Sequence, residues 1–128
     1  MKKLRKAALI LALLLTVGIL WSRVRLAADL KNLEFTQVDV SRIPDGTYRG
    51  RSDVGPVTVE AEVRVLDGEI EEVVLLRHDN GMGRPAEVMT GTMMVMETWD
   101  VECVSGATVS SQAIRQAVNR ALVSAVGD

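Results

Sequence analysis

A run of small and hydroxyl-bearing side chains is the part of this sequence best suited to bind a ligand. It reads Ser105-Gly106-Ala107-Thr108-Val109-Ser110-Ser111 and stands directly before an apolar repeat that is typical of a helix. One hydroxyl at such a place is normally the helix cap, which leaves three hydroxyls and the two smallest residues unexplained. A helix N-terminus also favours a phosphate, and glycine lets the backbone approach a ligand closely. From these residues alone, capping and phosphate binding both remain open. The run lacks the Gly-Lys-Ser/Thr ending of a P-loop.

The composition excludes several other kinds of reactive site. With one cysteine, Cys103, the chain cannot form an intramolecular disulfide, and one thiolate cannot hold a zinc ion or an iron–sulfur cluster. With one histidine, His78, a multi-histidine metal site is excluded as well. No catalytic acid–base pair or activated nucleophile stands out in the pattern. We therefore expect any chemistry that side chains alone cannot perform to require a bound cofactor.

The charges of the chain are divided unevenly along its length. Residues 1–25 hold six bases and no acid, whereas residues 26–128 hold nine bases and all 17 acids, a net charge of −8. Nucleic-acid binding draws most of its affinity from basic side chains that neutralise phosphates. A domain with this negative charge is therefore not expected to bind nucleic acid.

An uncharged stretch of fifteen residues, Ala7–Trp21, follows the first basic cluster. It is shorter than the roughly 20 residues that span a bilayer, but Leu4 and Ser22 can extend it and the flanking bases can snorkel. The sequence predicts an uncleaved membrane anchor over residues 1–25, because small residues suited to signal cleavage are missing near Ala28. A cleaved signal peptide and a buried core helix are the alternatives.

The bases on either side of this stretch indicate its orientation. Four bases precede the stretch and two follow it, which predicts a single-pass protein of the cell membrane with a cytoplasmic N-terminus. The C-terminal domain is then extracytoplasmic. We expect a stalk over residues 26–42 and one folded domain over residues 43–128.

Within that domain, the residue pattern predicts a hairpin and two helices. Val57–Leu66 alternates apolar and polar residues, Asp67-Gly68 is a two-residue turn, and Glu69–Arg77 is the return strand. A further short strand is expected over residues 47–52. Helices are expected over residues 85–98, where Met89, Met93 and Met96 would share one core face, and over residues 109–126, with Gly127 at the stop. The predicted fold class is α+β, an antiparallel sheet with two packed helices preceded by one transmembrane helix.

Several segments resemble one known family. The run from Glu102 to Ser111 resembles the motif Asp-x-x-Ser/Thr-Gly-Ala-Thr-x-Ser/Thr-Ser of the FMN-binding domain. This domain is carried by the C subunit of sodium-translocating NADH–quinone reductases, by the G subunit of Rnf complexes and by small anchored flavoproteins. Residues 45–50 resemble the family's opening strand, and residues 81–83 resemble its Gly-aliphatic-Gly loop. The likeness covers roughly residues 43–126; it departs from the family at Glu102, where an aspartate is usual, and at residues 78–80, where Glu-Thr-Pro is frequent.

The resemblance implies a cofactor, its residues and its partners. In the family, a flavin transferase esterifies the FMN phosphate onto the threonine that directly follows Gly-Ala in the motif, which is Thr108 here. The residues implied to contact the flavin are Ser105, Gly106, Ala107, Ser110 and Ser111 at its phosphate and ribityl chain, and His78, Gly81, Met82 and Gly83 beside its ring. The implied function is an electron-transfer module that works with a membrane redox partner or complex subunits rather than as a stand-alone enzyme. A sensory or structural subunit that binds FMN reversibly is the alternative.

Overall fold

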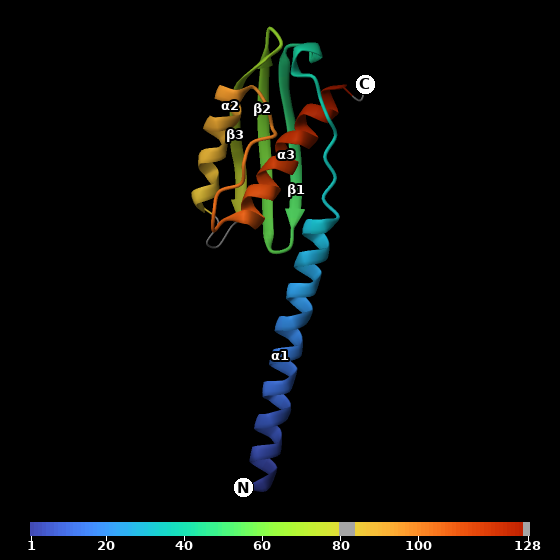
Figure 1. Cartoon of the computed structure of the whole chain (residues 1–128), viewed down its shortest axis with the longest axis vertical. Helices are drawn as coiled ribbons and strands as arrows, with labels where there is room; N and C mark the ends of the chain where they lie inside the picture. Colours follow the sequence, from blue (N-terminus) through green and yellow to red (C-terminus); the bar gives the residue numbers. More distant parts are fainter. Residues whose placement is uncertain (80–83, 127–128) are drawn as a thin grey trace. The chain divides into compact units, whose positions relative to one another are not determined.

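The computed structural model describes residues 1–79 and 84–126 (Figure 1). The chain divides into two compact units, Met1–Asn32 and Leu33–Asp128. Four residues singled out in the sequence, Gly81, Met82, Gly83 and Gly127, lie outside the described residues.

The first unit is a single long helix, α1 (Lys2–Lys31). At about 1.5 Å per residue its 30 residues exceed the roughly 30 Å of a bilayer's hydrocarbon core. None of these residues, all of which the structure describes, is buried. By length and composition this helix could cross a membrane, as the sequence predicts, and it continues beyond residue 25 into the predicted stalk.

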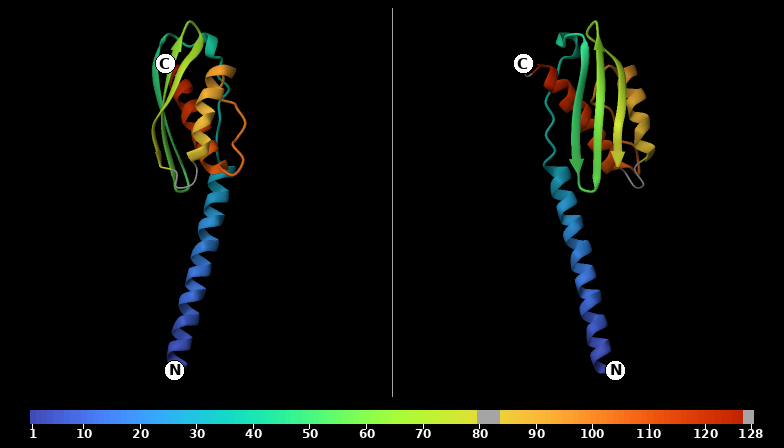
Figure 2. Two further views of the ribbon diagram at one scale, coloured as in Figure 1. Left: turned by 90° about the vertical axis from the view of Figure 1, so that its left-hand side faces the viewer. Right: turned by 180° about the vertical axis from the view of Figure 1, so that it is seen from behind.

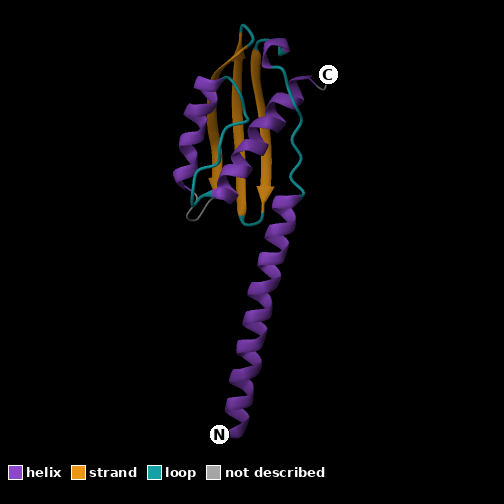
Figure 3. Ribbon diagram, in the orientation of Figure 1, coloured by secondary structure: helices purple, strands orange, loops and turns teal. Residues whose placement is uncertain are grey.

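The second unit is built on an antiparallel sheet of three strands in the order β1-β2-β3. The strands are β1 (Gly46–Val54), β2 (Val57–Leu66) and β3 (Glu69–Asp79), and Figure 3 separates them from the helices by colour. The predicted hairpin is confirmed: Asp67 and Gly68 have φ values of 53° and 74°, the left-handed pair that a tight hairpin turn requires. β1 is longer than the predicted strand at both ends.

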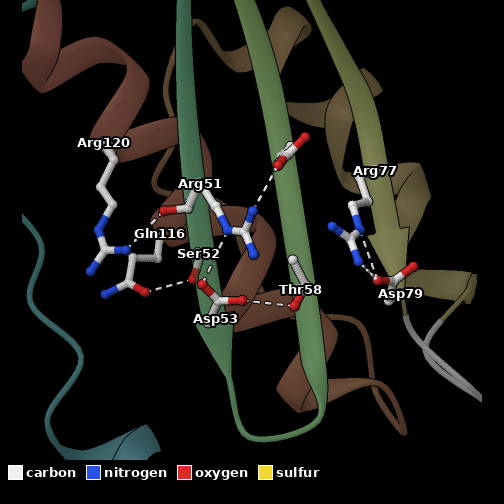
Figure 4. Close-up of polar contacts among 9 residues, drawn as sticks. Arg51, Ser52, Asp53, Thr58, Arg77, Asp79, Gln116 and Arg120 are labelled. Atoms are coloured by element: carbon white, nitrogen blue, oxygen red, sulfur yellow. Dashed lines mark hydrogen bonds and ion pairs between the residues drawn. The ribbon is translucent and has the colours of Figure 1, made fainter.

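The two faces of the sheet differ as the alternating pattern predicts. One face buries the apolar residues of β2, which are Val57, Val59, Ala61, Val63 and Val65. The other face carries cross-strand ion pairs, among them Arg51 with Glu60 at 3.0 Å. Figure 4 shows Asp53 between Arg51 and Thr58. The hydrogen bond from the Thr58 hydroxyl lowers the pKa of Asp53 below its ordinary value, and the hydrogen bond from Arg51 is the second cause of this shift.

Both C-terminal helices cover the apolar face of the sheet, as the views in Figure 2 show. α3 (Thr108–Val126) lies against β1 and β2, and its approach depends on Gly50. A Cβ at that position would stand 2.0 Å from the carbonyl oxygen of Ala117. A buried hydrogen bond of 2.6 Å from Ser52 to Gln116 and a bond of 2.8 Å from Arg120 to the carbonyl of Arg51 complete this contact (Figure 4).

The predicted helix over residues 85–98 has two parts. A 3₁₀ turn, η2 (Arg84–Val88), precedes α2 (Met89–Met96), which packs on β3. Met89 and Met93 are buried, but the expectation that Met96 shares their core face is wrong, since it is 63% exposed. The helix ends at Glu97, whose φ of 56° turns the chain and whose carboxylate accepts a hydrogen bond from the Ile70 amide.

Residues 33–39, which we call the strap, precede η1 (Val40–Arg42) and belong to the second unit. The strap contacts α3 through Thr36 and Asn119. The side chain of Asn119 in α3 makes two hydrogen bonds with the backbone of Thr36. Its Oδ1 accepts from the Thr36 amide at 3.0 Å, and its Nδ2 donates to the Thr36 carbonyl at 2.7 Å. Phe35 stacks on Trp99 with ring centroids 5.0 Å apart. Part of the segment predicted as a stalk is therefore folded structure.

Candidate functional site

The motif found in the sequence ends an irregular segment that joins α2 to α3. We call residues 97–107 the motif loop. Ser105, Gly106 and Thr108 are exposed, and Ala107 is buried beneath them. Gly106 has a φ of +82°, a backbone conformation that favours glycine, and a Cβ built on it meets no atom within 4 Å. The loop therefore presents its small residues and Thr108 to an open surface.

Thr108 is the first residue of the 19-residue helix α3. The first hydrogen bond of the helix is donated by the amide of Ser111 to the carbonyl of Ala107, with an N···O distance of 2.9 Å. The amides of residues 108–110 precede that bond and have no acceptor within the helix. The exposed threonine therefore stands at a helix end that favours negative charge.

The two serines that follow Thr108 point inward. Ser111 is buried, and its hydroxyl accepts a hydrogen bond of 2.9 Å from the amide of Val104, which fixes the motif loop to the helix. Ser110 is 2% exposed, and its hydroxyl lies 3.0 Å from Nε2 of His78. These serines have partners within the protein, and their expected contact with a phosphate stays a prediction.

His78, near the end of β3, joins this helix start to a second region. Its side chain is 3% exposed, and Nδ1 lies 3.0 Å from Oε1 of Glu87 in η2. Both residues line an open cleft of about 430 Å³ beside β3. The remaining lining residues are Val73, Val74, Leu75, Leu76, Arg77 and Thr90. The cleft therefore combines apolar side chains of β3 with a larger polar surface, to which Arg77, Thr90 and the His78–Glu87 pair belong.

A cluster around Arg115 holds the first half of the motif loop. The guanidinium of Arg115 pairs with Asp100 and lies over the rings of Phe35 and Trp99, 4.9 and 5.4 Å from their centroids. Cation–π contacts of this kind favour a fixed arrangement of the loop on α3. Glu102, by contrast, is exposed and makes no hydrogen bond or ion pair with the residues that the structure describes.

The structure therefore brings most of the predicted site residues into one region. Ser105, Gly106 and Thr108 are exposed at its surface, whereas Ala107, Ser110 and Ser111 are buried. Of the buried residues, Ser110 contacts His78. Glu87 and Arg115 also belong to this region, but the sequence does not indicate them, because a single charged residue among mostly apolar neighbours forms no recognisable motif. Within residues 1–79 and 84–126, no cluster of three or more His, Cys, Asp or Glu side chains could hold a metal ion.

A comparison with protein-family models matches residues 54–123 to the FMN-binding domain, which is more than half of the chain. The matched region runs from the end of β1 through the cleft and the motif loop into α3. No curated protein matches the chain.

Proposed function

The chain belongs to the FMN-binding domain family, and from this we propose that it is a membrane-anchored flavoprotein that carries FMN covalently on Thr108 and transfers electrons. FMN is the cofactor of the family. When bound, it supplies the redox chemistry. The residues of this chain hold the cofactor, orient it and limit its contact with water.

The observation that carries the proposal is the position of Thr108. Its hydroxyl is exposed at the first residue of α3, where free amides and the helix dipole favour a phosphate. The neighbouring Ser105 and Gly106 are exposed as well, so the surface around the threonine is open to a modifying enzyme. An FMN phosphate esterified here would be stabilised by the same groups that bind anions at other helix starts.

The cleft beside β3 fits the ring of the same cofactor. Its volume of about 430 Å³ lies in the range of roughly 300–1,000 Å³ found for small-molecule sites. Val73, Val74, Leu75 and Leu76 of β3 offer apolar contacts to a flat aromatic ring, and the polar lining residues offer hydrogen bonds to its heteroatoms. The hydrogen bond of 3.0 Å between His78 and Ser110 links this cleft to the helix that begins at Thr108.

Glu102 is the carboxylate that we assign to recognition by a flavin transferase. It stands where the family motif has aspartate, and it is exposed without a partner among the described residues. Asp100, the neighbouring acid, is engaged by Arg115. A carboxylate that is already paired is costly to recruit for another protein, because its present partner would lose its bond.

The location and partners follow from the N-terminal helix. α1 could cross a membrane, and the four bases before its apolar stretch favour a cytoplasmic N-terminus. The flavin domain is then extracytoplasmic, where covalent attachment keeps the cofactor from diffusing away. Its electron donor or acceptor is a redox partner or complex in the same membrane, and a flavin transferase is its modifying enzyme.

A second function is that the chain binds FMN reversibly as a sensory or structural subunit. The glutamate at position 102 supports it, because the motif that flavin transferases recognise usually has aspartate there. Denaturing electrophoresis separates the two functions. We expect a yellow, fluorescent band at the mass of the full chain after co-expression with a flavin transferase. A native protein that is yellow in solution but gives a dark band would support the reversible function.

A further inference from the structure

The side chain of His78 connects three elements that are far apart in the sequence. β3 carries His78, η2 carries Glu87 and α3 carries Ser110. The ring nitrogens lie 3.0 Å from the Glu87 carboxylate and 3.0 Å from the Ser110 hydroxyl, both within ordinary hydrogen-bond distance. We call these three side chains the brace.

The chemistry of the three groups allows both hydrogen bonds of the brace to form with a neutral or a protonated histidine. A glutamate carboxylate accepts hydrogen bonds, so Nδ1–H of His78 is the donor to Glu87. Nε2 then accepts the hydroxyl hydrogen of Ser110 in the neutral ring, or donates to its oxygen in the imidazolium. Because a serine hydroxyl serves in either direction, the brace acts through geometry.

A row of serine, histidine and glutamate also resembles the triad of a hydrolase, but the burial of its members argues against that role. In such a triad the acid is buried behind the histidine and the serine meets the substrate. Here the order is reversed: Ser110 is 2% exposed, whereas the side chain of Glu87 is 42% exposed. The brace is therefore suited to positioning and unsuited to nucleophilic attack.

We propose that His78 is a positioning residue that sets the separation between the cleft and the first turn of α3. His78 lines the cleft, and its partner Ser110 follows Thr108 by two residues. The inference rests on the proposed function, in which the FMN phosphate is held at Thr108 and the ring in the cleft. A ligand that must reach both places needs a fixed separation, whereas a ligand that occupies the cleft alone does not.

FMN and riboflavin provide that contrast, since riboflavin has the ring but no phosphate. The probe is the full-length protein in detergent, expressed without a flavin transferase so that Thr108 is unmodified, and titrated with each flavin by fluorescence. Ser110→Ala should raise the dissociation constant for FMN roughly tenfold, as expected for the loss of one partly buried hydrogen bond. The dissociation constant for riboflavin should not change.

The matched control removes a hydroxyl of β1 that donates a buried hydrogen bond to α3. Ser52→Ala breaks the bond of 2.6 Å to Gln116, which ties α3 to β1. It should lower the melting temperature about as much as Ser110→Ala and leave both flavin affinities unchanged. His78→Gln keeps a polar group that can reach Ser110, so it should lose less FMN affinity than His78→Ala.

Each of the following results would overturn the inference. An equal loss of FMN and riboflavin affinity in Ser110→Ala would make the serine a part of the ring site, and no loss of either would remove its role. A selective loss of FMN affinity in Ser110→Ala without any such loss in His78→Ala would mean that the serine binds the phosphate directly and that His78 does not position it. The same selective loss of FMN in Ser52→Ala would show that any loosening of α3 has this effect. A native protein that binds neither flavin also overturns the inference, while modification of Thr108 is judged separately by mass.

Discussion

Asp100 and Glu102 are two residues apart in the motif loop, yet they have different surroundings. Asp100 is bound to Arg115, whose guanidinium also lies over Phe35 and Trp99. Glu102 is exposed and makes no bond to the described part of the chain. The first acid therefore stabilises the loop, and the second is available to a modifying enzyme.

This difference predicts opposite results for two substitutions of the same kind. Glu102→Gln should reduce flavin loading by a transferase and leave the melting temperature of the protein unchanged. Asp100→Asn should lower the melting temperature slightly, since the pair is partly exposed, and retain loading. Loading is measured as the flavin fluorescence of the denatured band at equal protein. Glu102→Asp, which restores the family motif, should load at least as well as the native chain; loss of loading in Asp100→Asn alone would reverse our assignment.

At this scale the sequence predicts the identity of the site residues better than their orientation. The motif from Ser105 to Ser111 could be found because its residue types are unusual together. That Ser110 and Ser111 point inward depends on the rotation of α3 over the sheet. The pairing of His78 with Glu87 depends on how η2 folds over β3, which no local pattern encodes.

Among the elements, those with a strong period could be predicted and those held by single contacts could not. The β2–β3 hairpin and α3 follow from alternation and from a three-to-four-residue repeat. α2 ends at Glu97, which turns the chain and accepts a hydrogen bond from the Ile70 amide, and the exposure of Met96 in the last turn does not follow from the methionine spacing. The strap is fixed by Asn119 and Thr36, which are 83 residues apart in the sequence.

The close approach of α3 to β1 leads to a prediction at two glycines. Gly50→Ala should lower the free energy of unfolding by roughly 1–3 kcal/mol, because its Cβ would meet the backbone of α3 and force it away. Gly91→Ala in α2 is the control; its Cβ meets nothing within 4 Å, and alanine should stabilise the helix by up to about 1 kcal/mol. Urea denaturation measures both. A Gly50→Ala protein as stable as the native one would contradict the packing described.

For the whole molecule, the uneven charge determines the expected arrangement in the membrane. The bases of the first 25 residues flank an apolar stretch, whereas the domain carries a net charge of −8. The Lys and Arg residues next to the apolar stretch favour a cytoplasmic N-terminus, and a domain of about 100 residues can be exported largely regardless of its own charge. We therefore expect the FMN-binding domain to lie outside the cytoplasm.

This arrangement predicts the outcome of proteolysis on intact spheroplasts. Protease added outside should digest the flavin domain and leave the N-terminal segment protected. As the control, a cytoplasmic marker protein should remain intact until the membrane is dissolved with detergent. A domain that resists the protease until detergent is added would place it in the cytoplasm. A mature chain that begins near Ala28 would make the N-terminal helix a cleaved signal.

The central claim, that Thr108 carries FMN through a phosphoester, is tested most directly by mass spectrometry of the protein co-expressed with a flavin transferase. We expect a gain equal to one FMN less one water, located by fragmentation on the peptide that contains Thr108. Thr108→Ala should lose the added mass and keep its fold, because one hydroxyl at a helix start contributes only about 1 kcal/mol. Flavin on Ser110 or Ser111, or a native protein that gains no mass while Glu102→Asp does, would contradict the claim for this chain.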